Sequence, residues 1–288
     1  MDLFSIIIRR ISQALLYFLG IILSQGCVDP TSSETSELRV RFAAQSPTQQ
    51  YVRSAVLNLS GVAVRSVENS DFEAPGAIPF TIDLVGLSGS DTHILDVFSV
   101  ASGRYDAVRL DIQQINIKFL NGTQFNAVYS VPHLKEMIVE TTFPVIVDRG
   151  RKADVVVDFD LMRSIKIERD LQAFEGVTGI NITPVGRLVD LASSGQVSGS
   201  IKHDNGTPSD RRDDVPLLSH PITLFQLGSR DTVSVYTDDV GQFSAYFIPA
   251  GSYTMQGSST DSTGGWSTGH VEVTTASTTR KDIIIIRR

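Results

Sequence analysis

The chain has 288 residues, of which 41% are hydrophobic, 20% charged and 8% aromatic, so its composition is that of a globular protein with room for two domains. These figures exclude wholesale disorder and a coiled coil. The net charge of −7 argues against a nucleic-acid-binding surface, and a single cysteine excludes an intramolecular disulfide framework and a zinc site built on several thiolates.

The first 26 residues have the pattern of an export signal. Arg9 and Arg10 precede an apolar run over 11–23, and a short segment ending in Gly26 leads into the lone cysteine, Cys27. As an uncleaved anchor, this segment would hold both arginines in the hydrocarbon, at a cost of about 2.5 to 3.5 kcal/mol each near its centre. Cleavage of the leader is therefore favoured.

A cysteine directly after such a leader resembles the acylation site of a bacterial lipoprotein signal. The usual pattern has leucine three residues before the cysteine, whereas Ser24 stands there and Leu23 lies one place earlier. The resemblance implies a signal peptide over 1–26 and a lipid on the Cys27 thiol, with ordinary cleavage or an uncleaved anchor as alternatives. Residues 27–37 are mostly polar and predict a flexible tether to the membrane.

From residue 38 onward, short runs of alternating apolar residues separated by turn residues predict β-strands. The expected strands are 38–42, 56–59, 62–64, 80–84, 93–100, 105–112, 115–119, 125–129, 142–147, 154–159 and one near 180–189. Asn121 and Gly122 predict a hairpin turn, while 132–140 fits a short helical turn or a strand. The pattern predicts an all-β fold.

Small polar residues near 191–195 interrupt the strand pattern before a new alternating run begins. We therefore expect two consecutive antiparallel β-sandwich domains, of the Ig-like or transthyretin-like kind. The first would cover 38–191 and the second 196–288.

Five segments of the first predicted domain carry a family likeness. They are IDLVGL at 82–87, SGRYDAVRLDI at 102–112, NG at 121–122, VVVDFDL at 155–161 and ITPVGRLV at 182–189. In this order they resemble domain-of-unknown-function family 4382, which is common in bacterial envelope lipoproteins and implies no activity. In the fourth segment, alternation predicts a buried Phe159 between the exposed carboxylates of Asp158 and Asp160.

Three segments of the second predicted domain carry another likeness. They are ITLF at 222–225, YTDDVGQF at 236–243 and FIPAGSYT at 247–254. Together they are similar to the carboxypeptidase-regulatory-like domain, a transthyretin-like sandwich. Such domains usually serve as spacers or binding modules, so the resemblance implies one of these roles.

Residues 265–269 spell GWSTG, the G-x-S-x-G pattern of a nucleophile elbow. An elbow needs a strand before the serine and a helix after it, whereas here a loop-like run precedes and a strand-like run follows, so we predict a hairpin loop without a catalytic serine. An exposed Trp266 in this loop could stack on a sugar or anchor a partner, and Tyr253 is a second candidate ligand-binding residue. The alternative is that the Trp266 ring folds back over its own loop.

A polar loop over 203–214 could gather around a hard cation such as calcium. Its candidate ligands are Asp204, Asp210, Asp213 and Asp214. Two arginines in the loop would compete for these carboxylates and the spacing is not that of an EF-hand, so a solvated loop and a protein without a cofactor are the stronger prediction.

These observations predict a non-catalytic lipoprotein of the bacterial cell envelope, bound to the membrane through its lipid and acting as a binding or structural module. A glycan or an envelope protein is the expected partner. Val28 after the cysteine favours the outer membrane in the enterobacterial sorting pattern. One alternative is a structural spacer, and the other is a secreted or envelope hydrolase using Asp158 and Asp160. Carboxylates two apart on one strand face share similar surroundings, which disfavours an acid–base pair.

Overall fold

The computed structural model of the protein describes residues 35–44, 52–73, 79–87, 89–126, 128–129, 136–169, 177–207, 209–229, 231–257 and 265–286. Residues Ser36–Arg288 form one compact unit. The expected signal peptide, Cys27 and residues 28–34 of the expected tether lie outside the described residues. The sequence predicts a tether that reaches residue 37, but its last two residues, Ser36 and Glu37, already belong to the first strand.

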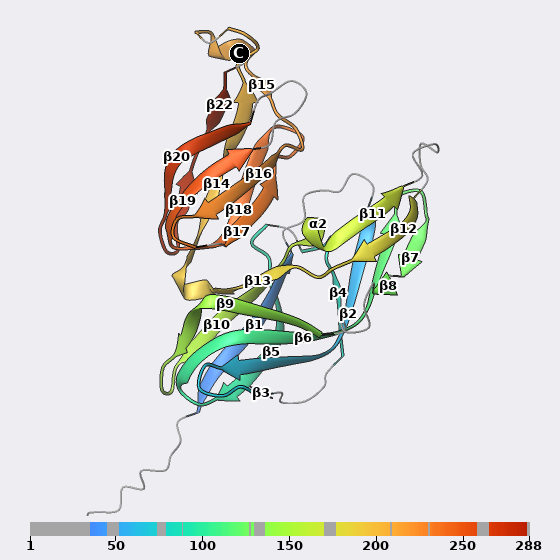
Figure 1. Cartoon of the computed structure of the whole chain (residues 1–288), viewed down its shortest axis with the longest axis vertical. Helices are drawn as coiled ribbons and strands as arrows, with labels where there is room; N and C mark the ends of the chain where they lie inside the picture. The colour runs from blue at the N-terminus through green and yellow to red at the C-terminus, as the bar shows by residue number, and fades with distance from the viewer. Residues whose placement is uncertain are drawn as a thin grey trace, which may run out of the picture. The chain divides into compact units, whose positions relative to one another are not determined.

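The first part of this unit is a sandwich of two main sheets (Figure 1). One has the strand order β13-β10-β1-β5, and the other has the order β3-β2-β6-β7 with β4 beside β2 and β9 beside β6. The bounds are β1 Ser36–Ala44, β2 Val52–Ser66, β3 Phe72–Glu73, β4 Phe80–Asp83, β5 His93–Val100, β6 Gly103–Phe119, β7 Gln124–Asn126, β9 Glu136–Val147, β10 Lys152–Phe159 and β13 Gly186–Asp190. Their inward side chains form one core, whose residues run in sequence from Leu38 to Leu188.

A small third sheet and a short helix accompany the first sandwich. The sheet has the order β11-β12-β8, with β8 Val128–Tyr129, β11 Ile165–Arg169 and β12 Val177–Ile182. The helix α2, Leu161–Ser164, is capped by Asp160, whose side chain accepts the N–H of Arg163. It turns the chain out of β10 and into the small sheet.

The second sandwich packs a sheet of order β17-β16-β19-β20 against one of order β15-β14-β18, in which β21 and β22 also pair with β14. The bounds are β14 Ser194–His203, β15 Val215–Pro216, β16 Pro221–Gln226, β17 Thr232–Tyr236, β18 Gln242–Pro249, β19 Gly251–Gly257, β20 Trp266–Val273, β21 Thr278–Arg280 and β22 Ile283–Ile285. Two short 3-10 helices are η1, Leu191–Ser193, and η2, Arg211–Asp213. The inward side chains of these two sheets form a second core, whose residues run in sequence from Val197 to Ile285.

The all-β prediction is confirmed, and several local differences have physical causes. β2 and β6 each join two expected strands, because β-bulges let the ladder continue through the irregular positions. The segment from 136 onward is strand, whereas the apolar run at 180–189 divides into β12 and β13. The Asn121–Gly122 hairpin forms as expected, with Gly122 at φ 87°.

Some strand pairs are parallel rather than antiparallel. β1 pairs with β10, β8 with β12, and β14 with both β21 and β22 in the parallel sense. Parallel neighbours need a long connection between them, so short-range turn signals in the sequence could not reveal these pairs.

Candidate functional site

The outer face of β10 is covered by residues of the second sandwich. Val156 on that face packs with Ala43, Val189 and Phe247 in a small apolar cluster separate from the two cores. Asp158 follows on the same face and is only 6% exposed. The contact therefore turns a strand face expected to be solvated into a buried junction.

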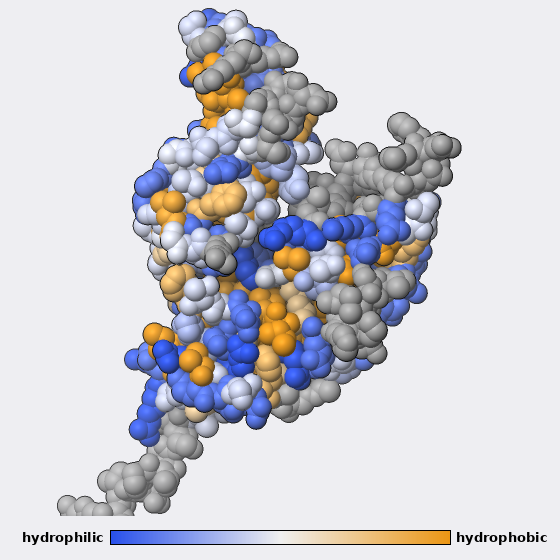
Figure 2. Space-filling view, in the orientation of Figure 1, coloured by the Kyte–Doolittle hydropathy of each residue, from blue (hydrophilic) through white to orange (hydrophobic). Residues whose placement is uncertain are grey.

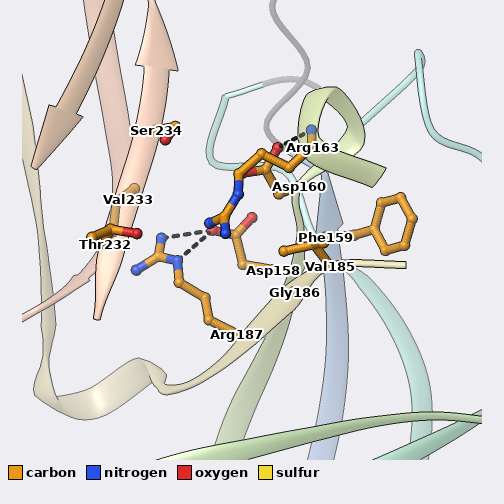
Figure 3. A pocket seen from close by; sticks show the side chains of 10 residues that line it. All are labelled: Asp158, Phe159, Asp160, Arg163, Val185, Gly186, Arg187, Thr232, Val233 and Ser234. Atoms are coloured by element: carbon orange, nitrogen blue, oxygen red, sulfur yellow. Dashed lines mark hydrogen bonds and ion pairs between the residues drawn. The ribbon is translucent and has the colours of Figure 1, made fainter. Parts of the chain in front are cut away.

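Arg187 of β13 lies at the centre of this junction (Figure 3). Its Nε and Nη2 donate to Oδ2 of Asp158 at 2.9 and 2.6 Å, across the β10–β13 pair. Its Nη1 donates to the carbonyl oxygen of Phe247 and its Nη2 to that of Tyr246, both at 2.8 Å. The planar guanidinium presents its donors in a fork, which lets one side chain bind all three residues.

The strand β18 presents both carbonyl oxygens because it bulges at this point. Two residues, Tyr246 and Phe247, stand opposite a single residue of β14. Phe247 has φ 54°, a left-handed conformation that bulky residues rarely adopt. A bulge re-aims the backbone of its strand, and here it directs two successive carbonyls at Arg187.

A small cavity of about 50 Å³ lies beside the ion pair (Figure 3). Its lining joins residues next to the ion pair to a strand of the second sandwich, namely Asp158, Phe159, Asp160, Arg163, Val185, Gly186, Arg187, Thr232, Val233 and Ser234. Burial raises the pKa of Asp160, although bonding to Arg163 opposes the shift. Pockets for small-molecule ligands measure about 300 to 1,000 Å³, so this cavity has the size for water molecules rather than for a sugar ring.

The expected arrangement of the two carboxylates is wrong in two respects, although Phe159 is buried as predicted. Asp158 is buried and paired with Arg187 rather than exposed, because the second sandwich covers its strand face. Asp160 lies beyond the end of β10 and caps α2. The two carboxylates therefore have different surroundings. Asp158 is held in an ion pair with Arg187, and Asp160 accepts a hydrogen bond from the backbone N–H of Arg163.

Tyr253 cannot serve as an exposed ligand-binding residue, so that prediction is wrong. Its side chain is 1% exposed in the second core, and its hydroxyl donates to the carbonyl oxygen of Pro249 at 2.8 Å. Burial raises the pKa of Tyr253 to about 12. The sequence pattern identified a strand residue here but not which way its ring points.

Trp266 is partly buried against the second core, and its indole N–H donates to Nε2 of His220 at 2.9 Å. The ring thus folds back onto its own sandwich. This is the alternative to an exposed ring that stacks on a sugar or anchors a partner. The segment 265–269 does not form the expected hairpin loop, because β20 already begins at Trp266.

The four aspartates of the loop over 203–214 are held by different partners. Asp204 accepts the N–H of Gly206, Asp210 pairs with Arg212, Asp213 accepts the hydroxyl of Thr207, and Asp214 lies 3.9 Å from Arg211. Bonding to Arg212 lowers the pKa of Asp210. The described residues contain no group of three or more His, Cys, Asp or Glu side chains placed to hold a metal ion. Calcium binding by this loop stays the alternative hypothesis to the predicted solvated loop.

Sequence reasoning missed Arg187, the residue that organises the junction. The available signal was a single arginine within the run Gly186–Val189, in a strand expected to be apolar. A charge inside an apolar strand needs a buried partner. Nothing in the sequence pattern, however, identified Asp158 or a bulge sixty residues later as that partner.

Apolar side chains on the face drawn in Figure 2 form separate groups among polar ones, including a group where β22 lies. The exposed large hydrophobic side chains of the described residues include Ile94, Phe143, Ile146, Ile284 and Ile286. Within the described part of the chain, no helix is long and apolar enough to span a membrane.

Comparison with known proteins identifies a family for the first part of the chain. The family model described as a domain of unknown function, DUF4382, matches residues 35–178, which is half of the sequence. No curated protein matches the sequence.

Three solved structures show weak similarity to this chain. The minor pilin GBS52 of Streptococcus agalactiae is 11% identical, with 87% of this chain and 96% of that chain covered and a TM-score of 0.30. The Bacillus anthracis TIE protein is 10% identical, with 87% and 58% covered and a TM-score of 0.27. The major pilin BcpA of Bacillus cereus is 10% identical, with 88% and 70% covered and a TM-score of 0.26. TM-scores of this size carry no argument about function.

Proposed function

The chain belongs to the DUF4382 family, and from this premise we propose that it is a non-catalytic structural module of the bacterial cell envelope. In this proposal the leader is removed before Cys27, a lipid on that thiol anchors the chain to the outer membrane, and residues 28–35 hold the folded part, which begins at Ser36, away from it. The support is the order of the N-terminal sequence, in which two arginines, an apolar run, a small residue and the lone cysteine follow one another.

We further propose that the DUF4382 domain, over 38–191, is followed by a carboxypeptidase-regulatory-like domain over 196–288. The support is the likeness of the segments 222–225, 236–243 and 247–254. These segments contribute to β16, β17, β18 and β19 of the second sandwich.

The contact of Arg187 with Asp158, Tyr246 and Phe247 is the observation that carries the structural role. It holds an ion pair of the first sandwich at the junction and sends two charge-assisted hydrogen bonds from that pair to the second sandwich, beside an apolar cluster. A spacer must hold its parts in a constant arrangement, and hydrogen bonds from one side chain to both sandwiches suit that task. The partner presented by the spacer would be another envelope protein or a glycan.

The same junction makes the hydrolase alternative less suitable. A general acid or base must exchange a proton with a substrate, whereas Asp158 is bound by the Nε and Nη2 of Arg187. The adjacent cavity of about 50 Å³ is also smaller than a substrate pocket.

Two measurements test the proposal. The intact mass of the membrane-fraction protein should match cleavage before Cys27 plus acyl chains, and the mass increment should be lost in Cys27→Ser. Backbone ¹⁵N relaxation of the same chain released from the membrane should give one rotational correlation time for both sandwiches. An unmodified soluble protein would overturn the anchor, and two independent correlation times would overturn the fixed spacer.

A further inference from the structure

The end of the β19–β20 hairpin is closed by the side chain of Trp266, the chain's one tryptophan. Trp266 begins β20 and pairs with Gly257 at the end of β19. The indole lies directly against Gly257, where a Cβ atom would collide with it. Its Nε1 donates to Nε2 of His220 at 2.9 Å, and the two rings stack at 22° with centroids 6.0 Å apart.

His220 is buried, and hydrogen bonds from its backbone groups to Thr237 fix its position. The residue is 2% exposed, and its N–H donates to the hydroxyl oxygen of Thr237 at 2.8 Å. That hydroxyl donates in turn to the carbonyl oxygen of Leu217 at 2.6 Å, and the Thr237 N–H donates to the carbonyl oxygen of His220. Because Nε2 accepts a hydrogen bond from the indole N–H, it is the unprotonated nitrogen, and the neutral imidazole carries its proton on Nδ1.

From this geometry we propose that His220 and Trp266 form an acid-sensitive latch on the second sandwich. Protonation turns Nε2 from an acceptor into a donor, so that the indole N–H and the imidazolium N–H point at each other and their hydrogen bond is lost. Protonation also places the positive charge of the imidazolium at a buried position, which is unfavourable. The indole then leaves its place against Gly257, and the end of the β19–β20 hairpin opens.

The charged groups around the latch do not offset this change. The titratable side chains on or next to the neighbouring strands are Tyr236 and Asp238 at the end of β17, Tyr253 on β19, and His270 and Glu272 on β20. The turn over 217–219 carries none, and β14, whose Ile201 carbonyl oxygen accepts the N–H of Leu217, adds Lys202 and His203. Asp238 accepts the backbone N–H groups of Val240 and Gln242, Glu272 accepts the hydroxyl of Ser252, and the Tyr253 hydroxyl donates to Pro249.

Burial sets the direction of the titration. It lowers the pKa of His220, with no contribution from a charged neighbour. A lowered pKa in the folded state means that the unfolded chain takes up the proton first as the pH falls, so acid opposes the closed latch. The latch is closed above the ordinary histidine pKa of about 6.5 and opens below it.

The test follows the fluorescence of Trp266 in the full chain as the pH is lowered through about 6.5. We expect the emission maximum to move to longer wavelength and acrylamide quenching to increase, with a midpoint below that pH, while far-UV circular dichroism retains its β signal. His220→Gln offers the indole an amide oxygen that does not titrate, so it should lose the transition. His270→Gln, at an exposed histidine on the same strand, should keep it.

Two outcomes would overturn the latch. One is a wild-type emission spectrum that stays constant until the whole chain unfolds, and the other is an unchanged transition in His220→Gln. If His220→Gln fails to fold, the Trp266 indole N–H resonance of the wild-type protein decides instead. A resonance that shifts together with the His220 ring protons supports the latch, and one that does not move during that titration refutes it.

Discussion

Replacing Arg187 with methionine removes both its ion pair with Asp158 and its hydrogen bonds to β18, because methionine keeps much of the aliphatic stem but lacks the guanidinium. The Asp158 side chain, 7% exposed, would be left buried without its partner. Removing one member of a buried ion pair costs about 3 to 5 kcal/mol. We expect Arg187→Met to lower the free energy of unfolding by this amount, since it also deprives two carbonyl oxygens of a charged donor.

Urea unfolding followed by circular dichroism measures this loss, and ¹⁵N relaxation shows whether the sandwiches still tumble together. Arg65→Met is the matched control, because Arg65 also bridges two acids, Asp106 and Glu140, and both of these acids belong to the first sandwich. Glu140 is 63% exposed, so this pair is partly screened and its loss should cost about 0 to 1 kcal/mol.

The double variant Arg187→Met with Asp158→Leu separates the ion pair from general packing. It removes the uncompensated charge as well, so it should recover part of the stability lost in Arg187→Met. The reasoning is refuted if Arg187→Met costs no more than Arg65→Met and leaves both sandwiches with one correlation time.

Three further outcomes follow from the sequence and structure. Cys27→Ser should release the chain from the membrane fraction, as measured by fractionation and intact mass. Tyr105→Phe and Tyr253→Phe should each lower the free energy of unfolding by about 0.5 to 1.5 kcal/mol in urea titrations, because each removes a hydroxyl that bonds a backbone carbonyl. Gly199→Ala should cost about 3 kcal/mol or more in the same assay, since its Cβ would overlap the backbone of Lys281.

The alternation of apolar residues along a strand predicts which side chains face a core. It does not predict what covers the outer face of the same strand. The alternation of β1 and β5 was sufficient to place those strands, and the Asn121–Gly122 turn fixed its hairpin locally. Asp158 was assigned to solvent by the same rule, and that assignment is wrong because Phe247, far along the chain, covers its strand face. Local patterns carry no information about such distant contacts.

The candidate site shows the same division between local and distant information. Arg187 was visible as a charge within an apolar strand, but its acceptors depend on a bulge in β18 and a left-handed Phe247. The sequence pattern leaves two orientations open for Trp266, and the choice between them depends on its hydrogen bond to His220, which lies just before β16. Only the fold could supply these partners.

The two sandwiches solve one structural problem in the same way. In the first, the Tyr105 hydroxyl donates to the carbonyl oxygen of Ala101, and in the second, the Tyr253 hydroxyl donates to that of Pro249, four residues earlier in each case. Each tyrosine follows by two residues the glycine that begins its strand, β6 or β19. Such a bond ties the start of a strand to the preceding corner, as in the tyrosine corner of immunoglobulin-like sandwiches.

This common bond accounts for the similar motifs SGRY at 102–105 and AGSY at 250–253 without an internal repeat. The strands that follow differ in length, with seventeen residues in β6 and seven in β19, and they pair in sheets of different strand order. The likeness therefore reflects a requirement of the sandwich architecture, in which a buried hydroxyl must find an acceptor and the nearest one is the carbonyl of its own corner.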